Sequence, residues 1–472
     1  MQNANTASLN PESAARTTNK FYLAAWRWHF YAGVYVVPFL FVLALTGLVM
    51  LYQPQIENLQ YHDRLYVTPS GQPTPAQAQL KAVRDAYPNA TVSEYALPPA
   101  SDRSARFALT TADGQALQVF VNPYTAEVLG DLDPATTVGI VAETIHGTLL
   151  IGDTGDRLIE IAAGLGIMLL ITGLYLWWPR TKAGAYRAFF PSLKARGRAL
   201  WRDLHASVGF YISLALLFFF ISGMAWTGVW GERIVQPFNS FPAAAWESVP
   251  LADETHHEAL NHGGEKNVPW GLEQTQMPAS GSMAGGTGIA QGTPVNLGSV
   301  VAYARDNGFT GFRVTLPEGE TGVYTIAAAT MSGDIKNPLD DRTLHIDRYS
   351  GKVLGDVGFA EYTLMAKGMA AGIALHMGEA GWWNVALNTI FCLAVLFIAG
   401  SGVVMWWLRR PKGVFRLAPP PMPRDMPLWQ GAVVVMLLVS LAFPLAGVTL
   451  LGVLALDLLV ISRIPALRRL VA

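Results

Sequence analysis

Four of the nine histidines lie at the ends of long apolar segments. His29 and His205 precede the first and third of these segments, and His146 and His376 precede the second and fourth. An imidazole at membrane depth is costly unless it binds a partner, and paired imidazoles from different helices are what a haem iron needs. The four positions therefore predict haem binding in a helix bundle, as in a transmembrane electron carrier.

The composition of the 472-residue chain is that of a membrane protein. Hydrophobic residues make up 51% of it, charged residues make up 14%, and the mean hydropathy is +0.29, which is rare in soluble domains. The formal net charge of -1 argues against nucleic acid as a partner. Because Cys392 is the single cysteine and no C-x-x-C-H motif occurs, any haem must be b-type and bound without covalent attachment.

Four apolar segments are each long enough to cross a hydrocarbon core of about 30 Å, which takes about 20 helical residues. A further stretch, Trp429 to Ile461, is too long for one ordinary crossing and is interrupted by Pro444 and Gly447. It is either one long tilted helix or a tight hairpin of two short ones. The four secure segments lie near Phe30 to Leu51, Leu158 to Trp178, Val208 to Trp230 and Trp383 to Leu408.

Clusters of Lys and Arg beside these segments set the expected orientation. Basic loops remain cytosolic, and the polar first 20 residues lack the layout of a cleaved signal peptide, so we expect a cytosolic N-terminus. The last basic cluster is cytosolic only if the C-terminal stretch crosses out and back, which favours six spans over five. Two polar segments, roughly Gln53 to Asp156 and Gly231 to Gly381, would then lie in the periplasm of a bacterium.

The chain contains two copies of one unit. Trp26 to Gly33 is echoed by Trp201 to Gly209, and both open a span with a histidine followed by a glycine four positions later. Each copy continues with a span, an outer segment, a second histidine, a second span, a Trp-Trp pair and a basic loop. The four histidines therefore occupy equivalent places in pairs.

Both outer segments predict a small α+β module. Amphipathic stretches at Thr74 to Tyr87 and Asn296 to Gly308 favour a helix packed on an antiparallel sheet. Gln118 to Gly130 and Leu344 to Gly355 share one pattern, which indicates a strand, a tight turn and a second strand in each.

The chain resembles the PepSY-associated transmembrane proteins, which include bacterial inner-membrane ferrisiderophore reductases. The resemblance covers nearly the whole chain, and it implies a di-haem membrane reductase acting on periplasmic ferric chelates. It rests on the Trp-Arg-x-His and Trp-Arg-x-x-His span openings, His146-Gly147 followed by Leu149-Leu150-x-Gly-Asp-x-Gly, Leu375-His376, the Tyr-x-Trp-Trp-Pro-Arg sequence at Tyr175 to Arg180, and the Pro-Tyr-Thr turn.

The expected fold is a mainly α membrane protein. Four core transmembrane helices form a bundle with a C-terminal hydrophobic hairpin, and two small α+β periplasmic PepSY-like modules are attached to it. In chain order we expect a cytosolic tail (1–25), the first span (26–52), the first module with the segment before the second span (53–156), the second span (157–178), a basic cytosolic loop (179–202), the third span (203–230), the second module (231–381), the fourth span (382–408), a cytosolic loop (409–427), the hairpin (428–462) and a cytosolic tail (463–472).

Similar depth in the membrane predicts how the ligands pair. His29 and His205 both begin outward-going spans, and His146 and His376 both precede inward-going spans, so each pair would hold one of two non-covalent b haems. Small residues that could give the macrocycle room are Gly33, Gly173, Gly209 and Gly402, although glycines also serve ordinary helix packing.

Other histidines are weaker candidates. His345 lies in an expected strand and His62 follows the first span, and either could replace an axial ligand. The tract containing His256, His257 and His262 could bind a divalent metal weakly, although a solvated loop explains it better.

The leading hypothesis is a ferric-chelate reductase of the bacterial inner membrane. Electrons would enter from a separate cytosolic reductase or a membrane quinol, because the chain has no dinucleotide fingerprint, and would reduce a periplasmic ferric siderophore. A non-enzymatic regulatory or binding protein that uses the outer modules is an alternative. An iron or siderophore transporter is another, and it would need polar residues at mid-membrane depth, for which Glu160 and Asp457 are the main candidates.

Overall fold

The computed structural model describes residues 20–180, 186, 188–238, 248–261, 268–411, 413, 417–420, 430–461, 463–465 and 467. In that part of the chain, four helices are long and apolar enough to cross a membrane, and a broken helix pair raises the number to five. The chain divides into two compact units. The first comprises residues 1–38, 162–213 and 397–472, and the second comprises 39–161 and 214–396.

The apolar segments form helices where the sequence predicts them, with one difference. The segment expected to be a single third span is divided at Ile212, whose φ of -90° and ψ of 0° interrupt the run of helical hydrogen bonds. The helices of these four segments are α1 (Lys20–Leu51), α6 (Asp153–Trp177), α8 (Arg198–Tyr211) with α9 (Ser213–Met224), and α12 (Trp382–Arg409).

The C-terminal apolar stretch is two helices, α13 (Gln430–Ala442) and α14 (Pro444–Leu456). Pro444 occupies the first turn of α14, where its missing N–H costs nothing. The helices pack tightly beside the break, since a Cβ added at Gly447 would lie 2.8 Å from Cβ of Ser440. The interruption predicted at Pro444 is confirmed, while the out-and-back crossing stays a prediction.

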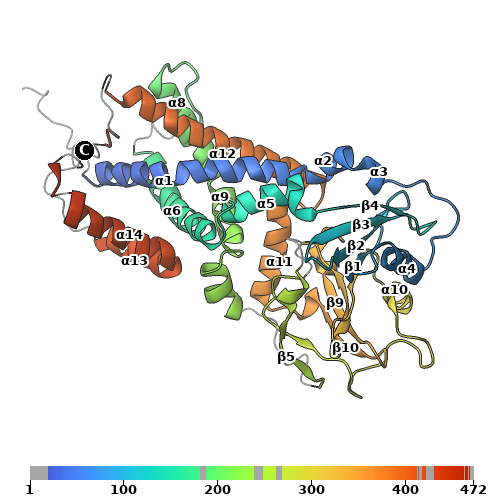
Figure 1. Ribbon diagram of the computed structural model, residues 1–472. Helices are drawn as coiled ribbons and strands as arrows, with labels where there is room; N and C mark the ends of the chain where they lie inside the picture. The colour runs from blue at the N-terminus through green and yellow to red at the C-terminus, as the bar shows by residue number, and fades with distance from the viewer. Residues whose placement is uncertain are drawn as a thin grey trace, which may run out of the picture. The chain divides into compact units, whose positions relative to one another are not determined.

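The second unit contains one eight-stranded antiparallel sheet built from both outer segments (Figure 1). Its strand order is β10-β9-β8-β7-β1-β2-β3-β4, so each module contributes four neighbouring strands and the pair β7 and β1 joins them. The sequence predicts two modules but not this shared sheet. The strands are β1 (Thr91–Ala96), β2 (Ala105–Thr110), β3 (Ala116–Val121), β4 (Val128–Leu132), β7 (Arg313–Thr315), β8 (Val323–Ala328), β9 (Arg342–Asp347) and β10 (Val353–Gly358).

Two amphipathic helices cover one face of the sheet, α4 (Ala76–Ala86) and α10 (Leu297–Asp306) (Figure 1). Both correspond to the helices expected from periodicity. They bury apolar side chains at helical spacing against the strands, and this shared core holds the two modules together. Its members include Leu80, Val83, Tyr95, Phe107, Val119, Leu297, Val300, Phe312, Ile326 and Ile346.

The second unit also contains smaller elements. They are α2 (Gln53–Gln60), α3 (His62–Leu65), α5 (Val138–Thr148), α11 (Leu364–Met377) and the short antiparallel pair β5 (Leu251–His256) and β6 (Gln276–Pro278).

A buried ion pair crosses the joint between the modules. Arg313 of β7 contacts Glu94 of β1 at 3.2 Å and Asp334 at 3.0 Å, and all three side chains are at most 7% exposed. Removing one partner of a buried ion pair leaves an uncompensated charge, which is far more costly than losing an exposed pair. Arg342 of β9 and Asp356 of β10 form a much more exposed ion pair in the same sheet, with side chains 31% and 40% exposed.

We expect Arg313→Leu to destabilise the joint by about 3–5 kcal/mol, because Glu94 and Asp334 would remain charged and buried. The matched change Arg342→Leu should cost about 0–1 kcal/mol. Hydrogen exchange of peptides from β1 and β7, followed by mass spectrometry, measures the difference. Equal loss of protection in the two variants would contradict this account of the joint.

Candidate functional site

The first histidine pair lies in the first unit. His29 of α1 and His205 of α8 face each other with ring centroids 6.4 Å apart and ring planes at 87°. Both side chains are half-buried. This is the pairing that the sequence predicts from membrane depth.

Hydroxyl groups from two further helices hold these rings. Nδ1 of His29 lies 3.1 Å from Oγ1 of Thr172 and 3.1 Å from the carbonyl oxygen of Leu169, both in α6. Nδ1 of His205 lies 2.8 Å from Oγ of Ser401 in α12. Each Nδ1 is therefore engaged by the protein, and Nε2 is the nitrogen left for a ligand.

The second pair lies in the second unit and has nearly the same geometry. His146 of α5 and His376 of α11 have ring centroids 6.4 Å apart and ring planes at 88°. Nδ1 of His146 lies 2.9 Å from Oγ1 of Thr46 in α1, and Nδ1 of His376 lies 2.8 Å from Oγ of Ser222 in α9. Both side chains are again half-buried.

Short capped helices position the second pair. The hydroxyl groups of Thr137 and Thr363 cap the N-termini of α5 and α11, and each histidine lies in the last turn of its helix. Gly378 ends α11 with a φ of 87°, a backbone conformation that glycine adopts without strain.

Two buried amides of α12 fix the end of α11. Asn384 donates to the carbonyl oxygen of Leu375 at 2.9 Å, and Asn388 donates to the carbonyl oxygens of Leu375 and His376 at 2.8 Å and 3.0 Å. These bonds satisfy carbonyl groups that a helix end leaves without partners. The backbone that carries His376 is thereby held in place.

The spacing of both pairs fits a metal between two imidazoles. Two metal–nitrogen bonds of about 2.0 Å and about 1.1 Å from each nitrogen to its ring centre add up to about 6.2 Å. The observed centroid separation is 6.4 Å in both pairs. With Nδ1 taken up by a hydroxyl group, Nε2 is the nitrogen through which each ring could coordinate such a metal.

A glycine lies beside each histidine ring. A Cβ added at the glycine would lie 3.1 to 3.9 Å from Cε1 of the ring, so each ring sits close to helix backbone. Gly33 and Gly209 do not have this role, because a Cβ at Gly33 would meet Leu169 and one at Gly209 would meet nothing within 4 Å. The four glycines are Gly47 at His146, Gly173 at His29, Gly223 at His376 and Gly402 at His205.

Sequence reasoning did not identify Gly47, Gly223 or the four hydroxyl residues. A comparison of the two repeats could have found them, because each hydroxyl directly precedes its glycine and has a counterpart in the other copy. Ser, Thr and Gly are common in membrane helices for packing reasons alone, so residue type gave no signal.

His345 lies apart from both pairs and forms a different contact. Its Nε2 is 2.9 Å from Nε2 of His257, and its Nδ1 is 2.9 Å from Oγ1 of Thr325. Nδ1 of His257 is 2.6 Å from the carbonyl oxygen of Thr275 and must donate to it. When both rings are neutral, Nε2 of His257 accepts a hydrogen bond from Nε2–H of His345, and Nδ1 of His345 accepts one from the hydroxyl group of Thr325. Both ring nitrogens of His345 are therefore hydrogen-bonded within the second unit.

The remaining candidates are also placed outside the two pairs. The side chain of His62 is 67% exposed and its ring stacks on Tyr66. Glu160 is buried and accepts from the backbone N–H of Val229 at 3.1 Å, and Asp457 is exposed.

The proposed metal-binding tract is only partly described, because His262 lies outside the described residues. In the same tract, His257 is fully buried, and its Nε2 is bonded to Nε2 of His345. Across the described part of the chain, no group of three or more His, Cys, Asp or Glu side chains is arranged to hold a metal ion.

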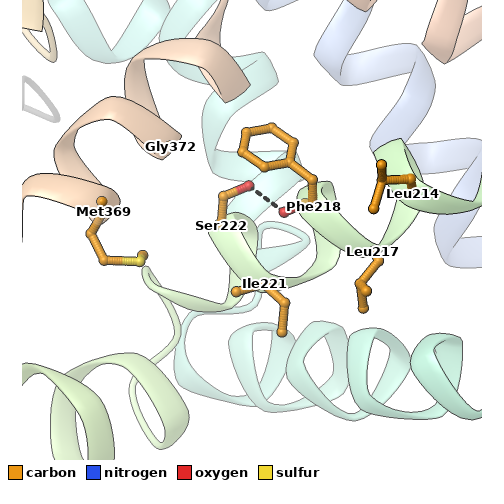
Figure 2. A pocket seen from close by; sticks show the side chains of 8 residues that line it. Leu214, Leu217, Phe218, Ile221, Ser222, Met369 and Gly372 are labelled. Carbon is orange, nitrogen blue, oxygen red and sulfur yellow. Dashed lines mark hydrogen bonds between the residues drawn. The ribbon is translucent and has the colours of Figure 1, made fainter. Parts of the chain in front are cut away.

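An apolar cavity of about 440 Å³ adjoins the second pair between α9 and α11 (Figure 2). Ser222 is the polar group that Figure 2 shows in its wall, and its hydroxyl is committed to the carbonyl oxygen of Phe218 and to His376. The cavity therefore suits an apolar group and offers little to a charged chelate. It is lined by Leu214, Leu217, Phe218, Ile221, Ser222, Gly368, Met369 and Gly372.

The burial of His257 and His345 makes this part of the fold sensitive to acid. Burial lowers the pKa of His257 to about 4 and the pKa of His345 well below its usual value. At these two side chains the folded state therefore binds fewer protons than the unfolded state below about pH 6.5. The stability that these groups contribute is present above that pH and is lost as the pH falls toward about 4.

We expect acidification from about pH 6.5 to 4 to remove on the order of 3 kcal/mol of stability from β8 and β9 through His257 alone. Protonation of the buried carboxyl of Asp341, whose pKa burial raises to about 7, acts in the opposite direction and is common to the wild-type and variant proteins. Hydrogen exchange corrected for intrinsic rates measures this. The double variant His257→Leu/His345→Leu should show a shallower fall. An equally steep fall in that variant would assign the acid sensitivity to other groups.

A family model described as "PepSY-associated TM region" matches residues 26–409, which include all four paired histidines and both segments that build the eight-stranded sheet. No curated protein matches the chain. The match covers most of the 472 residues, and with the apolar helices it makes the chain a multi-pass membrane protein that belongs to the PepSY-associated transmembrane family.

Proposed function

We propose that the protein is a di-haem b oxidoreductase of the bacterial inner membrane, which passes electrons from the cytosolic side to the periplasm and reduces a ferric siderophore or similar ferric chelate. The observation that supports this most is the matching geometry of the two histidine pairs, with centroids 6.4 Å apart and Nδ1 of every ring bound to a hydroxyl group.

The four histidines would hold two haems, each with imidazoles at both axial positions. Bound haem supplies reversible one-electron chemistry, and two strong axial ligands favour electron transfer over oxygen binding. The protein's part is to fix the rings and to exclude water with the apolar helices around them.

The electron donor would be a separate protein or a membrane quinol. The cytosolic loop expected at 179–202 is too short for a flavin or nicotinamide domain. The acceptor would be a ferric chelate on the periplasmic side, which takes up one electron per iron. Its chelating ligand binds the resulting ferrous ion less tightly than the ferric ion, so the iron is released.

Haem content of paired variants tests the ligand assignment. We expect wild-type protein to bind two haems, and the double variants His29→Ala/His205→Ala and His146→Ala/His376→Ala to retain one each. The cross-pair variant His29→Ala/His146→Ala should lose both, because each site loses one axial ligand.

Visible spectra and pyridine haemochrome stoichiometry give the readout, with His62→Ala as the control that keeps two haems. The assignment of the four histidines as haem ligands would be contradicted if wild-type protein showed no b-type bands or if the cross-pair variant retained a haem.

The reductase activity has a separate test. Dithionite-reduced wild-type protein should be reoxidised anaerobically by ferric nitrilotriacetate or a ferric trihydroxamate, with one ferrous ion formed per electron lost. Each double variant that retains one haem should transfer at most half as many electrons. If haem-loaded wild-type protein were not reoxidised by any ferric chelate, haem binding would stand and the reductase function would fall.

A further inference from the structure

Each paired histidine meets the same two-residue sequence on another helix. A Ser or Thr contacts Nδ1 through its hydroxyl group, and the glycine that follows it faces Cε1. The four hydroxyl–glycine pairs are Thr172-Gly173 at His29, Ser401-Gly402 at His205, Thr46-Gly47 at His146 and Ser222-Gly223 at His376.

The pairs follow the internal duplication. In each repeat, the pair on the first span serves the second histidine, and the pair on the second span serves the first. The distance along the chain from each histidine to the next hydroxyl residue agrees closely between the repeats. It is 17 residues from His29 to Thr46 and from His205 to Ser222. It is 26 residues from His146 to Thr172 and 25 from His376 to Ser401. Four equivalent contacts in two repeats are difficult to attribute to packing alone.

The hydrogen-bond directions at these hydroxyl groups are determined. Each hydroxyl donates its single proton to a carbonyl oxygen in the preceding turn of its own helix, so only its lone pairs face the imidazole. The acceptors are the carbonyl groups of Val42 for Thr46 at 2.7 Å, Met168 for Thr172 at 2.9 Å, Phe218 for Ser222 at 2.8 Å and Ile398 for Ser401 at 2.9 Å. Nδ1 must therefore carry the proton and donate it to the hydroxyl oxygen.

We propose that the four hydroxyl–glycine pairs are positioning elements for the axial imidazoles, which select the tautomer that presents the Nε2 lone pair and set the ring planes perpendicular within each site. This inference rests on the haem ligation proposed above. The glycine lets the ring approach the helix backbone, and the hydroxyl group fixes the rotation of the ring about its bond to Cβ.

The choice of a hydroxyl partner has an electronic consequence. A carboxylate at Nδ1 would draw the proton away and make the ligand more basic, whereas a hydroxyl oxygen is a neutral acceptor and leaves the imidazole neutral. Less electron donation to ferric iron raises the reduction potential relative to a histidine paired with a carboxylate. Perpendicular planes, at 87° and 88°, give ferric bis-imidazole haem a highly anisotropic low-spin EPR signal, distinct from the rhombic signal of coplanar rings.

The test uses EPR spectra, haem affinity and reduction potentials of the full-length protein. Wild-type protein should show the anisotropic signal at both haems. Thr46→Val, Thr172→Val, Ser222→Ala and Ser401→Ala each remove one acceptor, and each should weaken haem binding at its own site by about 10-fold or more and convert that site's signal toward the rhombic type.

Two controls separate this role from a structural one. Thr46→Ser and Thr172→Ser retain the hydroxyl group and should restore the wild-type spectrum. Thr449→Ala removes a hydroxyl that donates to the carbonyl oxygen of Leu445 in the same way but is bonded to no histidine. Measuring each variant in the double-alanine background of the other histidine pair assigns the signal to one site.

The distances at the glycines predict that Gly→Ala substitutions will perturb the EPR signal to different degrees. A Cβ would lie 3.1 Å from Cε1 of His29 at Gly173, 3.4 Å from that of His376 at Gly223, and 3.9 Å from that of His205 at Gly402. Gly173→Ala should therefore perturb the EPR signal most and Gly402→Ala least, although both glycines face the same haem site.

The outcomes distinguish the two proposals. Wild-type protein that binds no haem overturns the proposed function. Wild-type protein that binds two bis-histidine haems, with spectra and potentials unchanged in the valine and alanine variants, overturns the role of the hydroxyl groups and leaves the function standing. A rhombic wild-type signal overturns the assignment of the ring planes.

Discussion

An imidazole ring within an apolar helix bundle must have a partner for each of its two nitrogens, and this constraint shapes both histidine sites. A helix hydroxyl group takes Nδ1, and it can accept there because its own proton is donated to a backbone carbonyl group. What is left is an Nε2 lone pair on each ring. Two such lone pairs on rings 6.4 Å apart are what the proposed haem sites would use.

The duplication explains why so much of the structure occurs twice. Each histidine pair takes one ring from each repeat, and the two pairs agree in ring separation and differ by 1° in ring angle. The sheet is assembled in the same way, because β1 of the first module pairs with β7 of the second. The hairpin turns also correspond: Asn122 and Asp347 accept from the backbone N–H of Tyr124 and Tyr349, and Ala126 and Gly351 have positive φ at equivalent positions.

Histidines beside the eight-stranded sheet are bonded differently from those in the apolar helices. His257 and His345 satisfy one another and are completely buried, so their four nitrogens are used internally. The paired histidines of the helices are half-buried, and each has one nitrogen bonded to a hydroxyl group. The same side chain is therefore a structural element in one setting and an available ligand in the other, and the number of occupied nitrogens makes the difference.

The sequence by itself determined the features that local chemistry encodes. Hydrophobicity over about 20 residues marks the spans, helical and alternating periodicity marks α4, α10 and the hairpins, and the duplicated histidines indicate their own pairing by depth. Tertiary structure decided which residues meet the rings. Hydroxyl–glycine pairs such as Thr46-Gly47 lie on other helices, and the direction in which a helix face points depends on packing over the whole bundle. The break at Ile212, the joining of β1 to β7 and the contact of His257 with His345 are likewise long-range outcomes, for which residue type and spacing carry no signal.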